Sequence, residues 1–182
     1  MNSPNMLWPD CQPPTELHAG ALHIWALAID PTAQQCEQLR MCLSRDELDR
    51  ADRYRIERPR LRFTAARAGL RKILAAYLQQ PPDAIEFEYD TFGKPALSRV
   101  VRTSGLDFNL AHSGDLAVVA VSAIGEVGVD VEQLRPVRHA VGISERFFHQ
   151  QETAEVLRAP VDTLESRFFA CWTRKEAVIK NV

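Results

Sequence analysis

Residues 116–132 read LAVVAVSAIGEVGVDVE, and this stretch decides the fold class. It contains two valine-rich runs, residues 116–122 and 126–132, with Ala-Ile-Gly between them. Runs rich in β-branched residues on either side of a short glycine-containing connection are typical of a β-hairpin. We therefore predict two adjacent antiparallel strands, which place this part of the chain in a sheet.

The second run carries two acidic residues on one face. Asp130 and Glu132 are two positions apart, so a strand would direct both carboxylates to the same side. Carboxylate oxygens suit hard divalent cations, and the neighbouring Gly128 has no side chain to obstruct a ligand. The same pattern also fits an edge strand with a solvated polar face. A metal site would need a third acidic ligand from another part of the chain.

Helices and further strands surround this stretch. Ser44 and Glu47 form an S-x-x-E capping box, which predicts the start of a helix. In chain order we expect strand 22–29, helix 44–55, a helix between Pro59 and Pro81, strand 85–89 with a turn at 92–95, helix 144–157 and helix 162–182. This order is not a strict β-α-β alternation, so the predicted fold class is α+β.

The composition is that of a globular protein, because 46% of the 182 residues are hydrophobic and 25% are charged. No apolar run approaches the ~20 residues of a membrane span. Residues 1–14 lack the basic and apolar regions of a secretory signal, and none of the four cysteines forms a C-x-x-C pair. We expect a cytoplasmic protein with reduced thiols, no membrane partner and a flexible N-terminal extension at residues 1–20.

Positive charge is concentrated in one region, although the net charge of the chain is -2. Between Arg45 and Lys72 the chain has ten of its 22 basic residues and five acidic residues. Such a region favours an anionic partner, and the planar arginine side chain suits phosphate groups. A solvated helical face would have the same composition. The region lacks interleaved surface aromatics and any known nucleic-acid-binding motif, so we expect no nucleic acid partner.

The C-terminal helix offers a third acidic residue. Trp172, Glu176 and Lys180 recur at four-residue spacing and share one helical face. Glu176 could act as a metal ligand or general base, and Lys180 could stabilise negative charge that develops on a phosphate. A Glu/Lys pair at this spacing is also common as a surface salt bridge.

A polar cluster, FNLAHSGD, occupies residues 108–115 just before the first valine-rich run. His112 could bind an anion through its ring and nearby backbone N–H groups, or it could be a turn histidine that satisfies its own loop. His112, Ser113 and Asp115 are too close in sequence to form a hydrolase relay easily. The chain also has no G-x-S-x-G motif, Walker loop or dinucleotide fingerprint.

Taken together, these motifs resemble the Sfp-type 4'-phosphopantetheinyl transferases, which are holo-carrier-protein synthases. The matching blocks are residues 92–95 (FGKP), 108–114 (FNLAHSG), 128–132 (GVDVE), 145–148 (ERFF) with Glu152, and 172–176 (WTRKE) with Lys180. The W-T-x-K-E-A-x-x-K block is the most specific of these. The resemblance runs from about residue 22 to the C-terminus.

The resemblance implies a pseudo-dimer of two α+β lobes, residues 21–105 and 106–182, with coenzyme A between them. A faint repeat, RFTA at 62–65 and RFFA at 167–170, agrees with a duplicated half. Members of the family transfer 4'-phosphopantetheine from coenzyme A to a serine of an apo acyl or peptidyl carrier protein and release adenosine 3',5'-bisphosphate. We therefore expect a monomer whose partners are coenzyme A and a carrier protein.

The resemblance also assigns roles to single residues. It implies that Asp130, Glu132 and Glu176 hold Mg²⁺, and that Glu176 and Lys180 are catalytic. The implied contacts to coenzyme A are Arg50, Arg62, Lys94 and His112, of which Arg62 and His112 match contacts to the 3'-phosphate. Phosphoryl transfer needs neutralised charge on a polyanionic donor and an aligned nucleophile, which a metal ion and several cations supply.

The sequence departs from the family pattern at three positions and at its end. Ala111, Glu47 and Phe63 stand where family members often have a serine, a basic residue and a small hydroxyl residue. Family members continue beyond the equivalent of Lys180, so we expect an incomplete second lobe with exposed apolar faces on Trp172 and Ile179. The alternative to an active transferase is a truncated or degenerate relative that binds coenzyme A or a carrier protein without catalysis.

Overall fold

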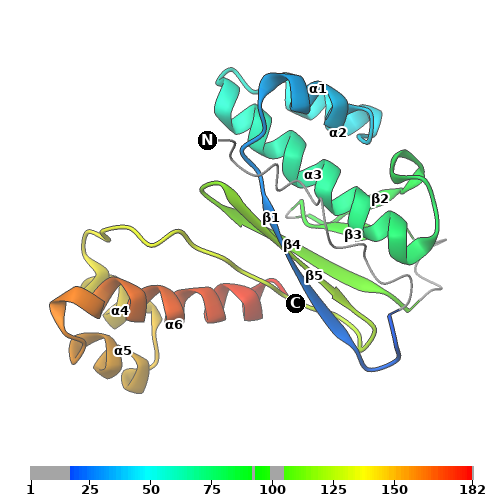
Figure 1. Ribbon diagram of the computed structural model, residues 1–182. Coiled ribbons are helices and arrows are strands. Elements are labelled where there is room, and N and C mark those ends of the chain that lie inside the picture. Colours follow the sequence, from blue (N-terminus) through cyan, green and yellow to red (C-terminus); the bar gives the residue numbers. More distant parts are fainter. Residues whose placement is uncertain (1–16, 92, 99–104, 182) are drawn as a thin grey trace.

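The computed structural model describes residues 17–91, 93–98 and 105–181. Most of the predicted N-terminal extension and Phe92 of the predicted turn lie outside these ranges. Figure 1 shows a sheet covered on one face by helices, with a separate group of helices beside it. In chain order the elements are β1 (Leu22–Ala28), α1 (Ala33–Arg40), α2 (Arg45–Asp52), α3 (Glu57–Leu78), η1 (Pro82–Ala84), β2 (Phe87–Tyr89), β3 (Pro95–Leu97), β4 (Asp107–Ser113), β5 (Leu116–Ser122), α4 (Ala140–Phe147), α5 (Gln150–Leu157), η3 (Val161–Thr163) and α6 (Leu164–Ile179). The predicted α+β class is confirmed.

The main sheet has three antiparallel strands in the order β1-β5-β4, and β2 and β3 form a separate pair. The turn Gly114-Asp115 joins β4 to β5, and Gly114 has a φ of 59°, which glycine adopts without strain. The hairpin therefore lies one strand earlier than predicted. Because β1 pairs with β5, the sheet also joins strands from both sides of the predicted lobe boundary at residues 105 and 106.

Residues 126–132 do not form the predicted strand, because side chains of β4 take up their backbone donors. The N–H of Val127 donates to Asp107 Oδ2 at 2.9 Å, and the N–H of Val129 donates to Asn109 Oδ1 at 3.1 Å. A Cβ atom on Gly128 would lie 1.8 Å from a carbonyl oxygen of α6. The close approach that this glycine permits is therefore to the α6 backbone and not to a ligand.

Helix α3 covers one face of the sheet, and α1 and α2 pack against α3 (Figure 1). The core between them contains Leu27 of β1, Leu70 of α3 and Val119 of β5. Burial of each such side chain stabilises the fold by ~1.5–3 kcal/mol. A Cβ atom on Gly69 would lie 2.6 Å from Leu27 Cδ1, so this glycine lets the helix lie close to the strand.

Three charged residues of the arginine-rich region are buried where α2 packs against α3, Glu47 on α2 and Arg67 and Arg71 on α3. Glu47 accepts hydrogen bonds from Nε of Arg67 and Nε of Arg71, both at 2.5 Å. The side chains of Glu47 and Arg71 are each 1% exposed. Glu47 also completes the predicted capping box, with the Ser44 N–H donating to Oε2 at 3.1 Å. Glu47 is therefore a structural counter-ion, and Arg67 and Arg71 do not belong to a solvated positive face.

Helices α4, α5 and α6 form a second hydrophobic core. Phe168 stacks on Trp172 with ring centroids 5.8 Å apart, and Phe148 stacks on Phe168 at 5.5 Å. Trp172 is thus partly buried, contrary to prediction, whereas Ile179 is 65% exposed. The predicted helix 144–157 is divided at His149, whose side chain caps α5. The described residues after Ser122 form no strand, so a second α+β lobe is not confirmed.

The length of the helices and the state of the cysteines bear on the compositional expectations. Across the described ranges, no helix combines the length and the apolar character that crossing a membrane would require. Cys36, Cys42 and Cys171 are free thiols, as predicted. Burial raises the pKa of Cys36 and of Cys171, which keeps both thiols protonated near pH 7.

Candidate functional site

The C-terminal end of α6 meets the sheet (Figure 1). Hydrogen bonds there connect predicted site residues from three parts of the chain. Lys180 is the C-cap of α6, and its Nζ donates to Asp130 Oδ1 at 2.5 Å. Lys94, in the connection between β2 and β3, donates from Nζ to the carbonyl oxygen of Lys180. The ammonium group of Lys94 therefore lies at the end of α6 where the helix dipole favours a cation.

His112 lies on β4, within the electrostatic reach of two predicted cations. Burial is the main cause that lowers its pKa, and the charges of Lys180 and Arg62 lower it further. The imidazole is therefore neutral near pH 7. Arg62 and Lys180 therefore both lie near enough to His112 for their charges to lower its pKa. A bound anion there would offset the two positive charges and raise the pKa of His112.

Side chains at alternate positions of β4 hold residues 126–133, called here the acidic segment, in place. Besides the contacts of Asp107 and Asn109 already described, Ser113 Oγ donates to Glu132 Oε2 at 2.9 Å and accepts from the Gln133 N–H at 3.1 Å. Asp107, Asn109 and Ser113 occupy odd positions of one strand and so share a face. This alternation of polar residues is the sequence signal that could have identified β4 as the support of the site.

The predicted metal ligands come from the acidic segment and from α6. The Asp130 side chain is 7% exposed, and its Oδ2 is buried without a hydrogen-bond partner. Such an oxygen is costly to bury, so it marks a position suited to a cation. Glu176 precedes Lys180 by one helical turn and shares its face of α6.

The three predicted ligands are not gathered around one point. Within residues 17–91, 93–98 and 105–181, no three Asp, Glu, His or Cys side chains lie close enough together to hold a metal ion. The contact that the structure does show is between Asp130 and the ammonium group of Lys180. The donor set of Asp130 and Glu132, with the free Oδ2 of Asp130, nevertheless fits a hard divalent cation.

A cavity of about 590 Å³ lies between the β2–β3 connection, β4 and the end of α6. Its lining includes Lys94, Lys180 and Asp90, together with Pro95, Asn109 and Leu110. This volume is within the range of pockets that hold small molecules and cofactors. Two lysines in its wall make it suited to an anionic ligand.

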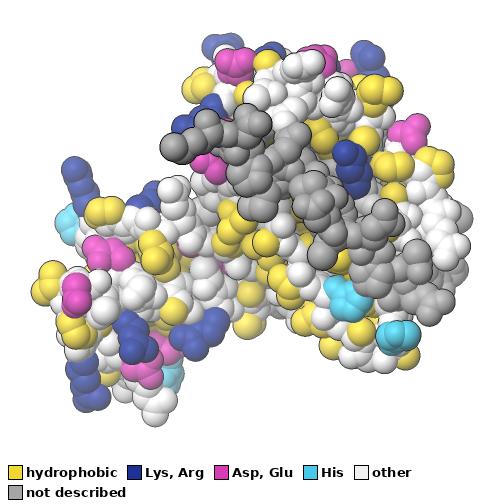
Figure 2. Space-filling view, viewed as in Figure 1, with side chains coloured by type: hydrophobic (Ala, Val, Ile, Leu, Met, Phe, Trp, Pro, Cys, Tyr) yellow, Lys and Arg dark blue, Asp and Glu magenta, His cyan; other side chains and the backbone are white. Residues whose placement is uncertain are grey.

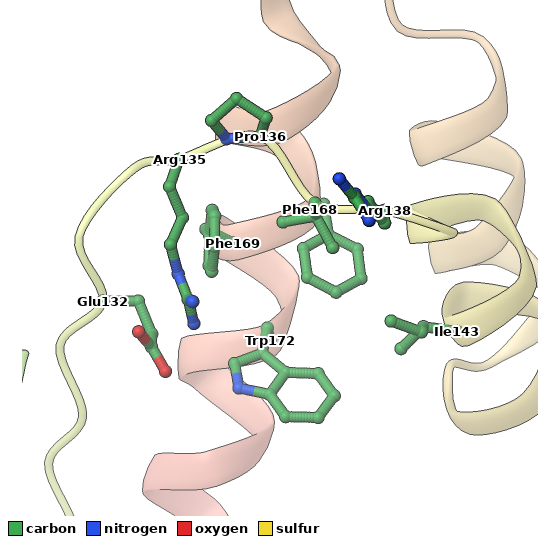
Figure 3. Close-up of a pocket in the computed structure, with 9 residues that line it drawn as sticks. Glu132, Arg135, Pro136, Arg138, Ile143, Phe168, Phe169 and Trp172 are labelled. Carbon is green, nitrogen blue, oxygen red and sulfur yellow. The ribbon is translucent and has the colours of Figure 1, made fainter.

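A second, smaller pocket of about 250 Å³ borders Glu132 (Figure 3). Phe168 and Trp172 form its apolar wall, and Arg135 extends beside Glu132. Arg135 is not predicted from the sequence, because an isolated arginine in a loop belongs to no motif.

Figure 2 shows exposed hydrophobic side chains where the sheet and the group of α4, α5 and α6 meet.

The remaining predicted contacts lie on α2 and α3. The guanidinium of Arg50 stacks over the Phe63 ring, 5.2 Å from its centroid. Arg62 donates from Nε and Nη2 to Asp115 Oδ1 at 2.8 and 2.5 Å, and Arg58 donates to Asp115 Oδ2 at 2.9 Å. The hydrogen bond from Arg62 is the main cause that lowers the pKa of Asp115. Arg62 is predicted from the sequence as a site residue, whereas its counter-ion Asp115 is not.

Two family models match consecutive parts of the chain. Residues 28–124 match the model described as 4'-phosphopantetheinyl transferase, N-terminal. Residues 126–182 match the 4'-phosphopantetheinyl transferase superfamily. The boundary between the two matches follows β5 and precedes the acidic segment that carries Asp130.

Curated relatives carry the same description. The chain is 38% identical over 173 residues to the 4'-phosphopantetheinyl transferase HetI of a Nostoc strain, an alignment that covers 95% of this chain and 73% of HetI. It is 33% identical to the 4'-phosphopantetheinyl transferase psf-1 of Bacillus pumilus, over 87% of this chain and 68% of psf-1. It is 36% identical to the 4'-phosphopantetheinyl transferase AcpT of Salmonella typhi, over 61% of this chain and 55% of AcpT.

Proposed function

The chain belongs to the 4'-phosphopantetheinyl transferase superfamily, and from this premise we propose that it transfers 4'-phosphopantetheine from coenzyme A to a serine of an apo acyl or peptidyl carrier protein. The observation that carries this proposal is the meeting of Lys94, Lys180 and Asp130 at the end of α6. It supplies cations for a polyanionic donor and a carboxylate for a metal ion in one place.

Coenzyme A binds, in this proposal, across the cavity beside Lys94 and Lys180. Arg62 and His112 bind its 3'-phosphate in this proposal, because the charge of Arg62 acts on His112 and lowers its pKa. Arg50 adds a further cationic contact from α2. Because the pKa of His112 is lowered, its imidazole is neutral in the free protein. The ring therefore takes up a proton when the phosphate binds, and only then carries a positive charge.

Asp130, Glu132 and Glu176 are the residues that would hold Mg²⁺. The buried, unpartnered Oδ2 of Asp130 supports this assignment, as does the contact of Ser113 that fixes Glu132. When bound, Mg²⁺ neutralises charge on the pyrophosphate and orients it. Lys180 donates to Oδ1 of Asp130, so a bound ion would share this carboxylate with the ammonium group of Lys180.

The protein's own residues have separate tasks in the transfer. Glu176 accepts the proton of the carrier serine hydroxyl as its oxygen attacks the phosphorus that carries the pantetheine group. The bond from that phosphorus to the bridging oxygen breaks, and adenosine 3',5'-bisphosphate leaves. Lys180 stabilises the negative charge that develops on the leaving phosphate. The products are the phosphopantetheinylated serine and the nucleotide.

Exposed arginines of α2 and α3 can also attract the carrier protein. Arg45, Arg50 and Arg58 are solvent-accessible on these helices. Carrier domains present an acidic face, and opposite charges on two surfaces accelerate their encounter. The carrier protein is therefore expected to approach from the side of the molecule that carries these helices.

Mass spectrometry tests this proposal. The protein is incubated with coenzyme A, Mg²⁺ and an apo carrier protein, and the molecular mass of the carrier protein is measured. Addition of one phosphopantetheine group, lost when the carrier serine is replaced by alanine, is the expected result. Binding of coenzyme A by calorimetry without any mass increase would contradict the transferase proposal.

A further inference from the structure

The carboxylate of Asp115 occupies one hydrogen-bonding edge of Arg62. Nε and Nη2 of Arg62 both donate to Asp115 Oδ1, at 2.8 and 2.5 Å. Arg58 Nη2 donates to the other carboxylate oxygen at 2.9 Å. A guanidinium binds phosphate through the same paired N–H groups. Asp115 and a phosphate group would therefore compete for the same donors.

The backbone that carries Asp115 is fixed, whereas its side chain reaches solvent. The Ile29 N–H donates to the carbonyl oxygen of Asp115 at 2.9 Å, and Gly114 holds the β4–β5 turn in a left-handed conformation. The Asp115 side chain is 44% exposed. Exposed ion pairs are weak compared with buried ones. A phosphate dianion can therefore displace the carboxylate by a side-chain rotation, with no change in the turn.

Resting on the proposed function, which assigns the 3'-phosphate of coenzyme A to Arg62 and His112, we propose that Asp115 is an internal competing anion that weakens binding of this phosphate. Arg58, which also lies 3.9 Å from Asp30, loses its contact with Asp115 at the same time as Arg62 and becomes a second guanidinium contact for the phosphate. Asp115 thus tunes affinity for 3'-phosphorylated nucleotides and does not affect those without this group.

The competition has a consequence for turnover. The product adenosine 3',5'-bisphosphate carries the same 3'-phosphate as coenzyme A. An internal anion that returns to Arg58 and Arg62 favours release of the product, because it replaces the phosphate at both guanidinium groups. Removal of the negative charge of Asp115 should then strengthen inhibition by adenosine 3',5'-bisphosphate.

Calorimetry on the whole chain tests the proposal, with adenosine 3',5'-bisphosphate and adenosine 5'-monophosphate as probes. Asp115→Asn is expected to lower the Kd for the bisphosphate about three- to tenfold and to leave the Kd for the monophosphate unchanged. Arg58→Gln is expected to raise the Kd for the bisphosphate by a similar factor. Asp115→Ser, measured alongside, should tighten binding as Asp115→Asn does.

Asp52→Asn is the matched control. Asp52 forms a two-bond pair with Arg40, at 2.9 and 3.1 Å, so this variant changes the net charge and removes an equivalent pair. It should leave both Kd values unchanged. Unchanged bisphosphate binding in both Asp115 variants would overturn the proposal, and weaker binding would overturn it and make Asp115 a positioning residue for Arg62. Failure of the parent protein to bind the bisphosphate and coenzyme A at all would instead overturn the proposed function.

Discussion

Helix α3 takes part in two ion-pair clusters with opposite surroundings, and in the second of them Arg58 also lies 3.9 Å from Asp30. In each, one carboxylate lies between two arginines four residues apart, Arg67 and Arg71 around Glu47, and Arg58 and Arg62 around Asp115. Glu47 is 1% exposed and Asp115 is 44% exposed. Burial makes the first cluster a structural element, whereas exposure leaves the second available to a ligand.

The largest expected effect comes from breaking the buried cluster. Glu47→Gln leaves two buried guanidinium groups without their counter-ion and should reduce the free energy of unfolding by about 3–5 kcal/mol. It also weakens the capping box that begins α2. Denaturant unfolding followed by circular dichroism measures this change. A loss below about 1 kcal/mol would show that the two clusters do not differ as described.

The exposed cluster should respond in the opposite way, with a change in binding and little change in stability. Arg62→Gln removes a guanidinium assigned to the 3'-phosphate and should weaken binding of adenosine 3',5'-bisphosphate about tenfold, or ~1.4 kcal/mol. Thermal unfolding of the variant is the control. Unaltered nucleotide affinity would remove Arg62 from the proposed site.

A smaller effect should appear in the pH dependence of nucleotide binding. Because the pKa of His112 is lowered in the free protein and a phosphate raises it, binding takes up a proton and tightens as the pH falls from about 8 towards 6. Calorimetry across this range should give a Kd that falls several-fold further in the parent than in His112→Gln. The variant corrects for titration of the phosphate itself. Parallel curves would contradict a charge-gaining role of His112.

The smallest expected effect is on the stability of the exposed cluster. Asp115→Asn should change the free energy of unfolding by less than about 1 kcal/mol, because solvent screens this pair. Denaturant midpoints of this variant and of Glu47→Gln, measured side by side, sharpen the contrast between the clusters. A loss as large as that of Glu47→Gln would assign both clusters the same structural role.

Local patterns predicted the elements whose hydrogen bonds are local or whose residues are uniformly apolar. The S-x-x-E box at Ser44 gave the start of α2, and the valine-rich run gave β5. The same reasoning failed at residues 126–132, because the backbone donors of Val127 and Val129 are satisfied by side chains of β4. It missed β4 itself, because the polar residues at 108–115 were interpreted as a cluster before the next strand and not as part of a strand.

Residue types and their motifs predict several charged groups that the fold brings together, but not all of their partners. Lys180 contacts both Lys94 and Asp130, and the roles assigned to these three residues remain predictions. The counter-ion Asp115 was not predicted, since it lies 53 residues from Arg62 and meets it only through packing of α3 on the sheet. Long-range pairs of this kind depend on the tertiary structure, which no local pattern encodes.

The most direct test of the account is transfer by Glu176→Gln. This variant keeps the size of the side chain but removes the proposed base and metal ligand, whereas Lys94, His112 and Lys180 remain. Glu165→Gln, near the beginning of the same helix, is the control for a lost carboxylate. Carrier mass and coenzyme A affinity are measured for both. The account predicts that only Glu176→Gln abolishes transfer while binding of coenzyme A is largely retained. Unchanged turnover in Glu176→Gln would contradict it.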